Sequence, residues 1–231
     1  MKISLNLPFV LLGFALLLVL TGSSALASPK PVVLASIKPV GMLVKAVVGD
    51  EFSVDVLLPT NVSPHDYALK FSDIRAVRDA ELVVWVGPEL ESMLGKPLKP
   101  LSGKQLQLTG LNSLQWPEEK ENGHEHDHHH GVHTRDPHLW LNPTNSSAIV
   151  VAIAKLLAEK YPEKAALFER NAGIFVKELN ELDDLNRQRL EPLKNHGFVV
   201  THDGYGHFVD YYGLHQRSEE RRVGKEGRSR W

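Results

Sequence analysis

The first hundred or so residues alternate short apolar runs with amphipathic stretches. Val40–Val48 places apolar residues at helical spacing and stops at Gly49-Asp50, and a further helix is expected to open at Ser72, a candidate N-cap. The apolar runs have the length of buried strands: Val32–Ala35, Phe52–Leu58 and Leu82–Gly87. Strands that alternate with helices predict an α/β fold with a parallel sheet.

The later part of the chain is dominated by helical periodicity. One helix is expected from Asn142-Pro143 to Lys160, and a longer one from about Glu163 to Leu190. Unbroken, the longer helix would measure ~42 Å, enough to connect two lobes. A new strand is predicted at Phe198–Thr201, and a further helix at Phe208–Tyr212.

The N-terminus has the order of a secretory signal peptide. A basic start at Lys2 is followed by the apolar run Leu7–Leu20 and by Ala25-Leu26-Ala27, a small-x-small cleavage site. The apolar run is shorter than the ~20 residues that span a bilayer, although an N-terminal membrane anchor is the alternative. Because the chain has no cysteine, a lipid-anchored lipoprotein is excluded, and we expect a protein exported to the periplasm.

The composition excludes some kinds of ligand and partner. Without cysteine there are no disulfides and no thiolate metal ligands. The formal net charge of -2 gives no sign of the basic patch that a nucleic-acid-binding protein needs. Histidine is the outlier, with 12 residues.

Half of these histidines lie in a polar stretch, residues 115–135, that lacks apolar periodicity and reads as a loop. Its histidines alternate with acidic residues: His124, His126, His128, His129, His130 and His133. Imidazole is the commonest side chain bound to transition metals, so we interpret the loop as a secondary zinc-capture site. Ordering it would cost entropy, which predicts weaker binding than at a rigid site; an inert solvated loop is the alternative.

Three other histidines lie at or just after the ends of predicted strands: His65, His138 and His202. Ligands of open α/β sheets gather at the carboxyl ends of the strands. Three imidazoles with a water or carboxylate form a common Zn²⁺ shell. Each histidine alone is more often a capping or hydrogen-bonding group, so the prediction depends on the set of three.

These three histidines lie in motifs through which the chain, from about Val32 to Leu214, resembles the ZnuA-like zinc-binding solute receptors of ABC transporters. The motifs are Pro64-His65-Asp66-Tyr67, Asp136-Pro137-His138-Leu139-Trp140-Leu141-Asn142-Pro143 and Thr201-His202-Asp203-Gly204-Tyr205, and the acidic, His-rich loop adds to the likeness. The resemblance implies a two-lobe α/β fold with a long connecting helix and metal in the cleft between the lobes. It places His65 and His138 in the first lobe and His202 in the second. Manganese relatives typically carry a carboxylate at the last position, so a histidine favours zinc.

Two aspartates adjoin the proposed ligands. Asp66 and Asp203 are expected to orient the metal-binding histidines rather than bind metal. The late acidic residue that often supplies a fourth ligand in the family is not found, and water could take its place. The partner implied is the membrane permease of a zinc ABC transporter, and we expect a monomer that binds neither nucleic acid nor, after signal removal, membrane.

The expected organisation has five parts. Residues 217–231 are basic and contain few apolar residues, so they are interpreted as a non-native tail, with a solvated native tail as the alternative. The second lobe is expected to be incomplete. The parts are a signal peptide (1–27), an N-terminal α/β lobe with the His-rich loop (28–162), a connecting helix (163–192), the start of a C-terminal lobe (193–216) and the tail (217–231).

Alternative functions remain open at this point. A metal-binding surface adhesin or zinc buffer would use the same fold and differ only in its partner. A zinc hydrolase would also use three histidines and an open position. The sequence has no HExxH motif and no carboxylate in an evident general-base position, so we predict a binding protein and not an enzyme.

Overall fold

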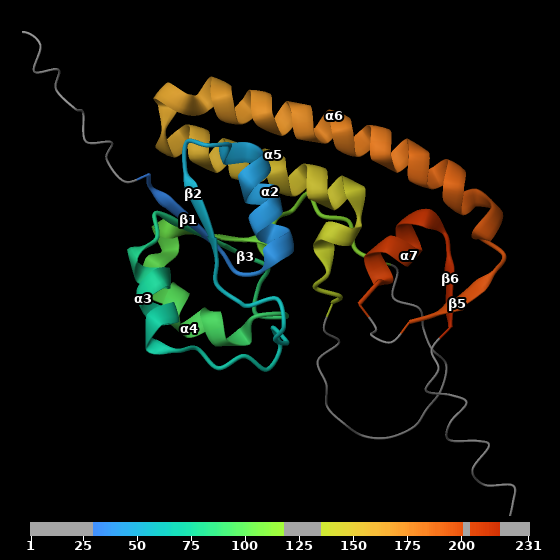
Figure 1. Cartoon of the computed structure of the whole chain (residues 1–231), viewed down its shortest axis with the longest axis horizontal. Coiled ribbons are helices and arrows are strands. Elements are labelled where there is room, and N and C mark those ends of the chain that lie inside the picture. Colours follow the sequence, from blue (N-terminus) through green and yellow to red (C-terminus); the bar gives the residue numbers. More distant parts are fainter. Residues whose placement is uncertain (1–29, 118–134, 201–203, 218–231) are drawn as a thin grey trace, which may run out of the picture. The chain divides into compact units, whose positions relative to one another are not determined.

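The computed structural model describes residues 30–117, 135–200 and 204–217, as Figure 1 shows. The predicted signal peptide, the six loop histidines, His202 and Asp203 lie outside these residues, as does all but the first residue of the predicted tail. Within the described residues, no helix is long and apolar enough to cross a membrane.

A four-stranded parallel sheet forms the centre of the first part of the chain. Its strands are β1 (Val32–Ala35), β2 (Ser53–Val56), β3 (Leu82–Trp85) and β4 (Gln105–Gln107), in the order β2-β1-β3-β4. The central strand β3 is buried along its whole length, as its continuous apolar sequence predicts. The predicted parallel α/β fold is confirmed, and β4 is an addition that the sequence reading missed.

Two predicted helices, α2 (Lys38–Val48) and α3 (Phe71–Asp79), connect the first three strands. Three short helices that were not predicted lead from β3 to β4: η1 (Ser92–Leu94), α4 (Gly95–Leu98) and η2 (Lys99–Lys104). A further turn, η3 (Leu108–Gly110), follows β4. The expected N-cap of α3 was wrong. Ser72 lies inside the first turn, and the carboxylate of Asp73 accepts the Lys70 backbone N–H at 2.8 Å instead. An acidic side chain suits this place because the helix N-terminus carries a partial positive charge.

Two helices lie side by side across the sheet region in Figure 1 and contact one another along their length. After the short turn η4 (Leu139–Leu141), α5 runs over Pro143–Lys160; η5 (Pro162–Lys164) then leads into α6, Ala165–Leu190. The 26 residues of α6 correspond to about 39 Å, so the long helix is confirmed. It runs back along α5 and continues past the start of that helix to the last elements of the chain.

Those last elements form what we call the C-terminal segment, residues 193–217. It begins at the last residue of the turn η6 (Glu191–Leu193) and contains β5 (Gly197–Val199), α7 (Gly206–Tyr212) and β6 (His215–Arg217). β5 and β6 pair in parallel as a two-stranded sheet. α7 ends at Gly213, whose left-handed φ of 65° lets the Leu214 N–H reach back to the Val209 carbonyl at 2.9 Å.

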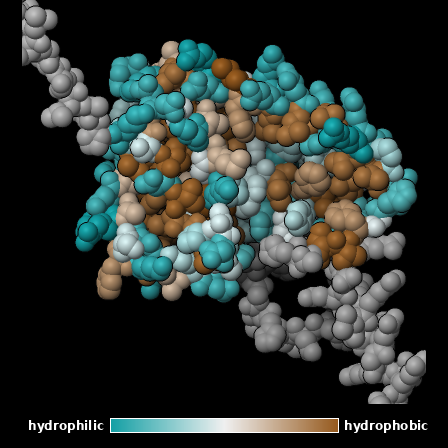
Figure 2. All heavy atoms as spheres, in the orientation of Figure 1, coloured by the Kyte–Doolittle hydropathy of each residue, from teal (hydrophilic) through white to brown (hydrophobic). Residues whose placement is uncertain are grey.

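The protein has two hydrophobic clusters of different size among its described residues. The larger lies between the four-stranded sheet, α2, α5 and the first half of α6, and includes Phe52 and Phe168. The smaller contains Val209, Tyr212 and Leu214. Figure 2 shows hydrophobic surface near the positions of α7, β5 and β6. Beyond the large cluster, α6 also presents Leu182 to solvent at 50% exposure.

Candidate metal site

A cavity of about 240 Å³ opens where three strands of the parallel sheet end. Ile37 follows β1, Pro59 and Pro64 follow β2, and Leu90 follows β3; all four line the cavity together with His138. The carboxyl ends of parallel strands meet at one edge of a sheet, which is where α/β proteins bind ligands. The structure therefore places a predicted ligand at the predicted edge.

His138 is held at two atoms by one carboxylate. Oδ1 of Asp136 lies 2.7 Å from the His138 ring atom Nδ1 and 3.0 Å from its backbone N–H. Burial alone would raise the pKa of Asp136, but the hydrogen bonds from His138 outweigh it and hold that pKa below its ordinary value. Asp136 is therefore an anion at neutral pH and orients the ring. Because Nδ1 faces this carboxylate, a metal would bind through Nε2.

The local sequence explains why His138 is fixed. Asp136 accepts from the residue two positions later, a turn that aspartate forms readily, and Pro137 restricts the backbone between them. The ring of Trp140 packs edge-on against the His138 ring, with 5.4 Å between the centroids. Asn142 then caps α5 by accepting from the Thr144 and Asn145 N–H groups, at 2.8 and 3.3 Å. A predicted ligand thus lies in a short turn that these contacts hold in place.

His65 lies on the loop after β2, next to the same cavity. Its backbone N–H donates to the Ser63 hydroxyl at 3.3 Å, and the preceding Pro64 lines the cavity. Both His65 and the following Asp66 are exposed. The structure thus brings the loop that carries His65 to the cavity that His138 lines.

The remaining predicted site residues cannot be placed in this way, because His202, Asp203 and the loop histidines lie outside the described residues. Among the residues that are described, no group of three or more His, Asp or Glu is arranged to hold a metal. The three-histidine site therefore stays a prediction, with His138 and the His65 loop as its described part.

The sequence reading missed two residues at this site. Asp136 could have been found from its place two residues before His138, where an aspartate commonly caps a turn. His207, on α7, is only 1% exposed, and its Nε2 lies 2.9 Å from the Asp136 carbonyl oxygen, 71 residues away along the chain. No local pattern marks this contact, because it depends on how the C-terminal segment packs.

The comparisons with known proteins agree with this fold. The model of the family described as "ZnuA: Zinc-uptake complex component A periplasmic" matches residues 33–227. A Yersinia pestis protein, "High-affinity zinc uptake system protein ZnuA", is 36% identical over 202 residues, covering 79% of this chain and 63% of the relative. A Streptococcus pyogenes relative, "Zinc-binding protein AdcA", is 31% identical over 230 residues, covering 94% of this chain and 44% of the relative.

Solved structures show the same fold. The crystal structure of Zn(II)-bound AdcA from Streptococcus pneumoniae matches with a TM-score of 0.69 and 28% identity, over 82% of this chain and 39% of that one. The chain thus spans less than two thirds of the Yersinia and streptococcal proteins, while the family match covers most of its own residues. The chain belongs to the ZnuA family of periplasmic zinc-uptake components.

Proposed function

We propose that the protein binds Zn²⁺ outside the cytoplasm and delivers it to the permease of an ABC uptake transporter. The observation that carries the proposal is the cavity at the strand ends, where His138 is oriented by Asp136 beside the loop of His65. Family membership and the zinc-uptake names of the relatives support zinc as the cargo. Imidazole ligands also suit Zn²⁺ better than Mn²⁺, which prefers oxygen.

The proposed ligands are His65, His138 and His202, with water as the fourth. Asp136 adds to Asp66 and Asp203 as a residue that orients a metal-binding histidine. Metal-bound imidazoles almost always donate their second N–H to a carboxylate or carbonyl, and Asp136 offers His138 that partner. The role is binding and delivery without catalysis, by a monomer that a signal peptide directs to the periplasm.

The experiment is a competitive zinc titration of the mature chain against a chelator of known affinity. We expect one tight equivalent in the natural sequence and its loss in the variant His65→Ala/His138→Ala/His202→Ala. Thermal unfolding of the zinc-free proteins provides the control for folding. Equal tight binding by both proteins would refute the assignment of the site.

The His-rich loop is proposed to capture zinc more weakly. Deleting residues 122–133 should remove weak equivalents and leave the tight one, because the ligands of the tight site lie outside the deletion. The two classes are separated by repeating the titration at rising chelator strength. Loss of the tight equivalent in the deletion variant would show instead that the loop builds the main site.

A further inference from the structure

A buried polar cluster joins the C-terminal segment to the first part of the chain. It contains His207 on α7, the backbone carbonyl of Asp136, Asn145 on α5 and Gln115. His207 and Asn145 are 1% and 0% exposed. Buried polar groups are costly unless they are paired, so these contacts define how the two parts fit together.

The backbone of Gln115 determines which way the Asn145 amide points. The Gln115 N–H donates to Asn145 Oδ1 at 2.7 Å, and Asn145 Nδ2 donates to the Gln115 carbonyl at 2.8 Å. A flipped amide would place donor against donor and acceptor against acceptor. Nδ2 is thereby fixed toward Nδ1 of His207, 3.4 Å away.

This arrangement selects one form of the His207 ring. The Asp136 carbonyl can only accept, so Nε2 must carry a hydrogen; the Asn145 amide nitrogen can only donate, so Nδ1 must accept. The neutral ring with its hydrogen on Nε2 satisfies both hydrogen bonds. Burial also lowers the pKa of His207, although the Asp136 carbonyl and the nearby carboxylates of Asp136 and Asp210 oppose this.

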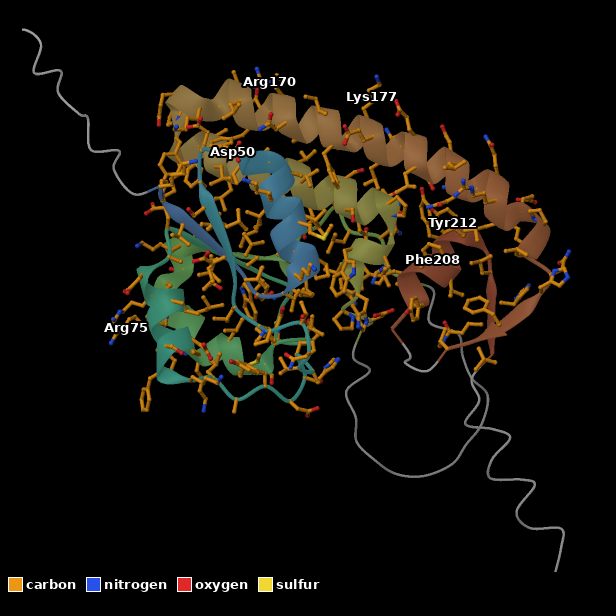
Figure 3. All side chains as sticks on the ribbon, viewed as in Figure 1. Asp50, Arg75, Arg170, Lys177, Phe208 and Tyr212 are labelled. Carbon is orange, nitrogen blue, oxygen red and sulfur yellow. The ribbon has the colours of Figure 1, made fainter. Side chains whose placement is uncertain are left out.

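The other side of α7 is attached to α6. The Tyr211 hydroxyl donates to the Asp183 carboxylate at 2.8 Å, and Asn186 donates to the Tyr212 hydroxyl at 3.3 Å. Figure 3 shows Tyr212 between α7 and the C-terminal half of α6. The contacts of His207 are thus separate from those that attach α7 to the long helix, and a change at His207 leaves the latter in place.

We propose that His207 is a positioning residue for zinc. Its Nε2–H donates to the backbone carbonyl of Asp136, so it holds α7 against the turn in which the Asp136 carboxylate orients His138. This inference rests on the proposed function, because the orientation of His138 affects zinc affinity only if His138 is a zinc ligand.

The test compares three single variants with the natural sequence. His207→Phe keeps a ring of similar size and loses both polar contacts. His207→Gln keeps one donor and one acceptor and should restore them. Tyr211→Phe is the matched control, because it removes one hydrogen bond from the same helix on its α6 side.

Two readouts separate positioning from general stability. The first is zinc affinity by chelator competition. The second is the distance distribution between spin labels on cysteines introduced at Arg75 and Asp210, both exposed, in a chain without native cysteine. This second readout needs no zinc and reports directly on how firmly α7 is held.

We expect His207→Phe to lower zinc affinity by about tenfold or more, at the lower end of the 10–100-fold cost of losing a residue that supports a metal ligand. It should also broaden the distance distribution, His207→Gln should largely restore both, and Tyr211→Phe should change neither. Unchanged affinity in His207→Phe, failure of His207→Gln to restore it, or an equal loss in Tyr211→Phe would overturn the proposal.

Failure of the proposed function gives a different result. If the natural sequence has no tight zinc site, that function is wrong and the zinc role of His207 is overturned with it. A broadened distribution in zinc-free His207→Phe would then still show that His207 holds α7.

Discussion

Replacing Asp136 with alanine tests how the site orients its ligand. The substitution removes the carboxylate oxygen that lies 2.7 Å from the His138 ring and 3.0 Å from its backbone N–H. The backbone carbonyl of Asp136, which contacts His207, remains. The variant therefore isolates the side-chain contact with His138.

The expected loss follows from the kind of bond removed. A hydrogen bond to a charged group contributes about 1.5–3 kcal/mol, and a zinc-bound imidazole is a stronger donor than a free one. Loss of a carboxylate that supports a metal-bound histidine typically lowers affinity 10–100-fold. That range corresponds to about 1.4–2.8 kcal/mol, in agreement with one lost ring contact.

The assay is chelator competition on four variants, with thermal unfolding to check the fold. Asp136→Ala should lose 10–100-fold in zinc affinity, and Asp136→Asn, which keeps an acceptor oxygen, should lose less. Asp79→Ala is the matched control, because Asp79 is an exposed aspartate paired with Arg78 on the surface. If Asp136→Ala binds zinc as tightly as the natural sequence while His138→Ala does not, the orienting role is wrong.

Three further predictions concern the site and its supports. In Gly206→Ala the new Cβ would lie 2.6 Å from Asp136 Oδ2, so both zinc affinity and melting temperature should fall; no change in either would show that the carboxylate moves freely. Burial raises the pKa of Glu91 above its ordinary value, so the folded protein holds this proton more tightly than the unfolded chain does. The free energy of unfolding should therefore fall as pH rises through the raised pKa. Glu91→Gln should remove that fall, which is measured as melting temperature against pH. Parallel profiles for the natural sequence and the variant would contradict the prediction. Asn142→Ala removes the N-cap of α5 and should cost about 1 kcal/mol in urea unfolding, and a cost near zero would mean that the cap is dispensable.

Local patterns predicted the helices and the central strands well. Asn142-Pro143 marks the start of α5, and the spacing of apolar residues marks α2 and α6. The edge strand β4 was missed because its sequence, Gln-Leu-Gln, has no strand-like run. It is a strand because it pairs with β3, and because Gln105 accepts from the Trp85 indole at 3.0 Å and donates to the Leu98 carbonyl at 2.9 Å. Such contacts are tertiary, and no local rule contains them.

The residues of the candidate site also divide into those that the sequence predicts and those that depend on tertiary packing. The position of His138 at a strand-end cavity was predictable, because sheet topology decides which loops meet. The role of Asp136 could have been predicted from its place in a turn. The role of His207 could not, because its partners Asp136 and Asn145 are 71 and 62 residues away along the chain. A buried histidine on a short helix is ordinarily a core residue, and only its polar partners reveal the contact between the two parts.

The most direct test of the central claim is a crystal structure of the zinc-loaded mature protein, with anomalous data collected on both sides of the zinc absorption edge. One strong anomalous peak should lie in the strand-end cavity, about 2.0–2.1 Å from imidazole nitrogens of His65, His138 and His202. Nε2 of His138 should be the bound atom, with Nδ1 still on Asp136. A peak elsewhere, or a zinc ion in the cavity without His138 among its ligands, would contradict the account.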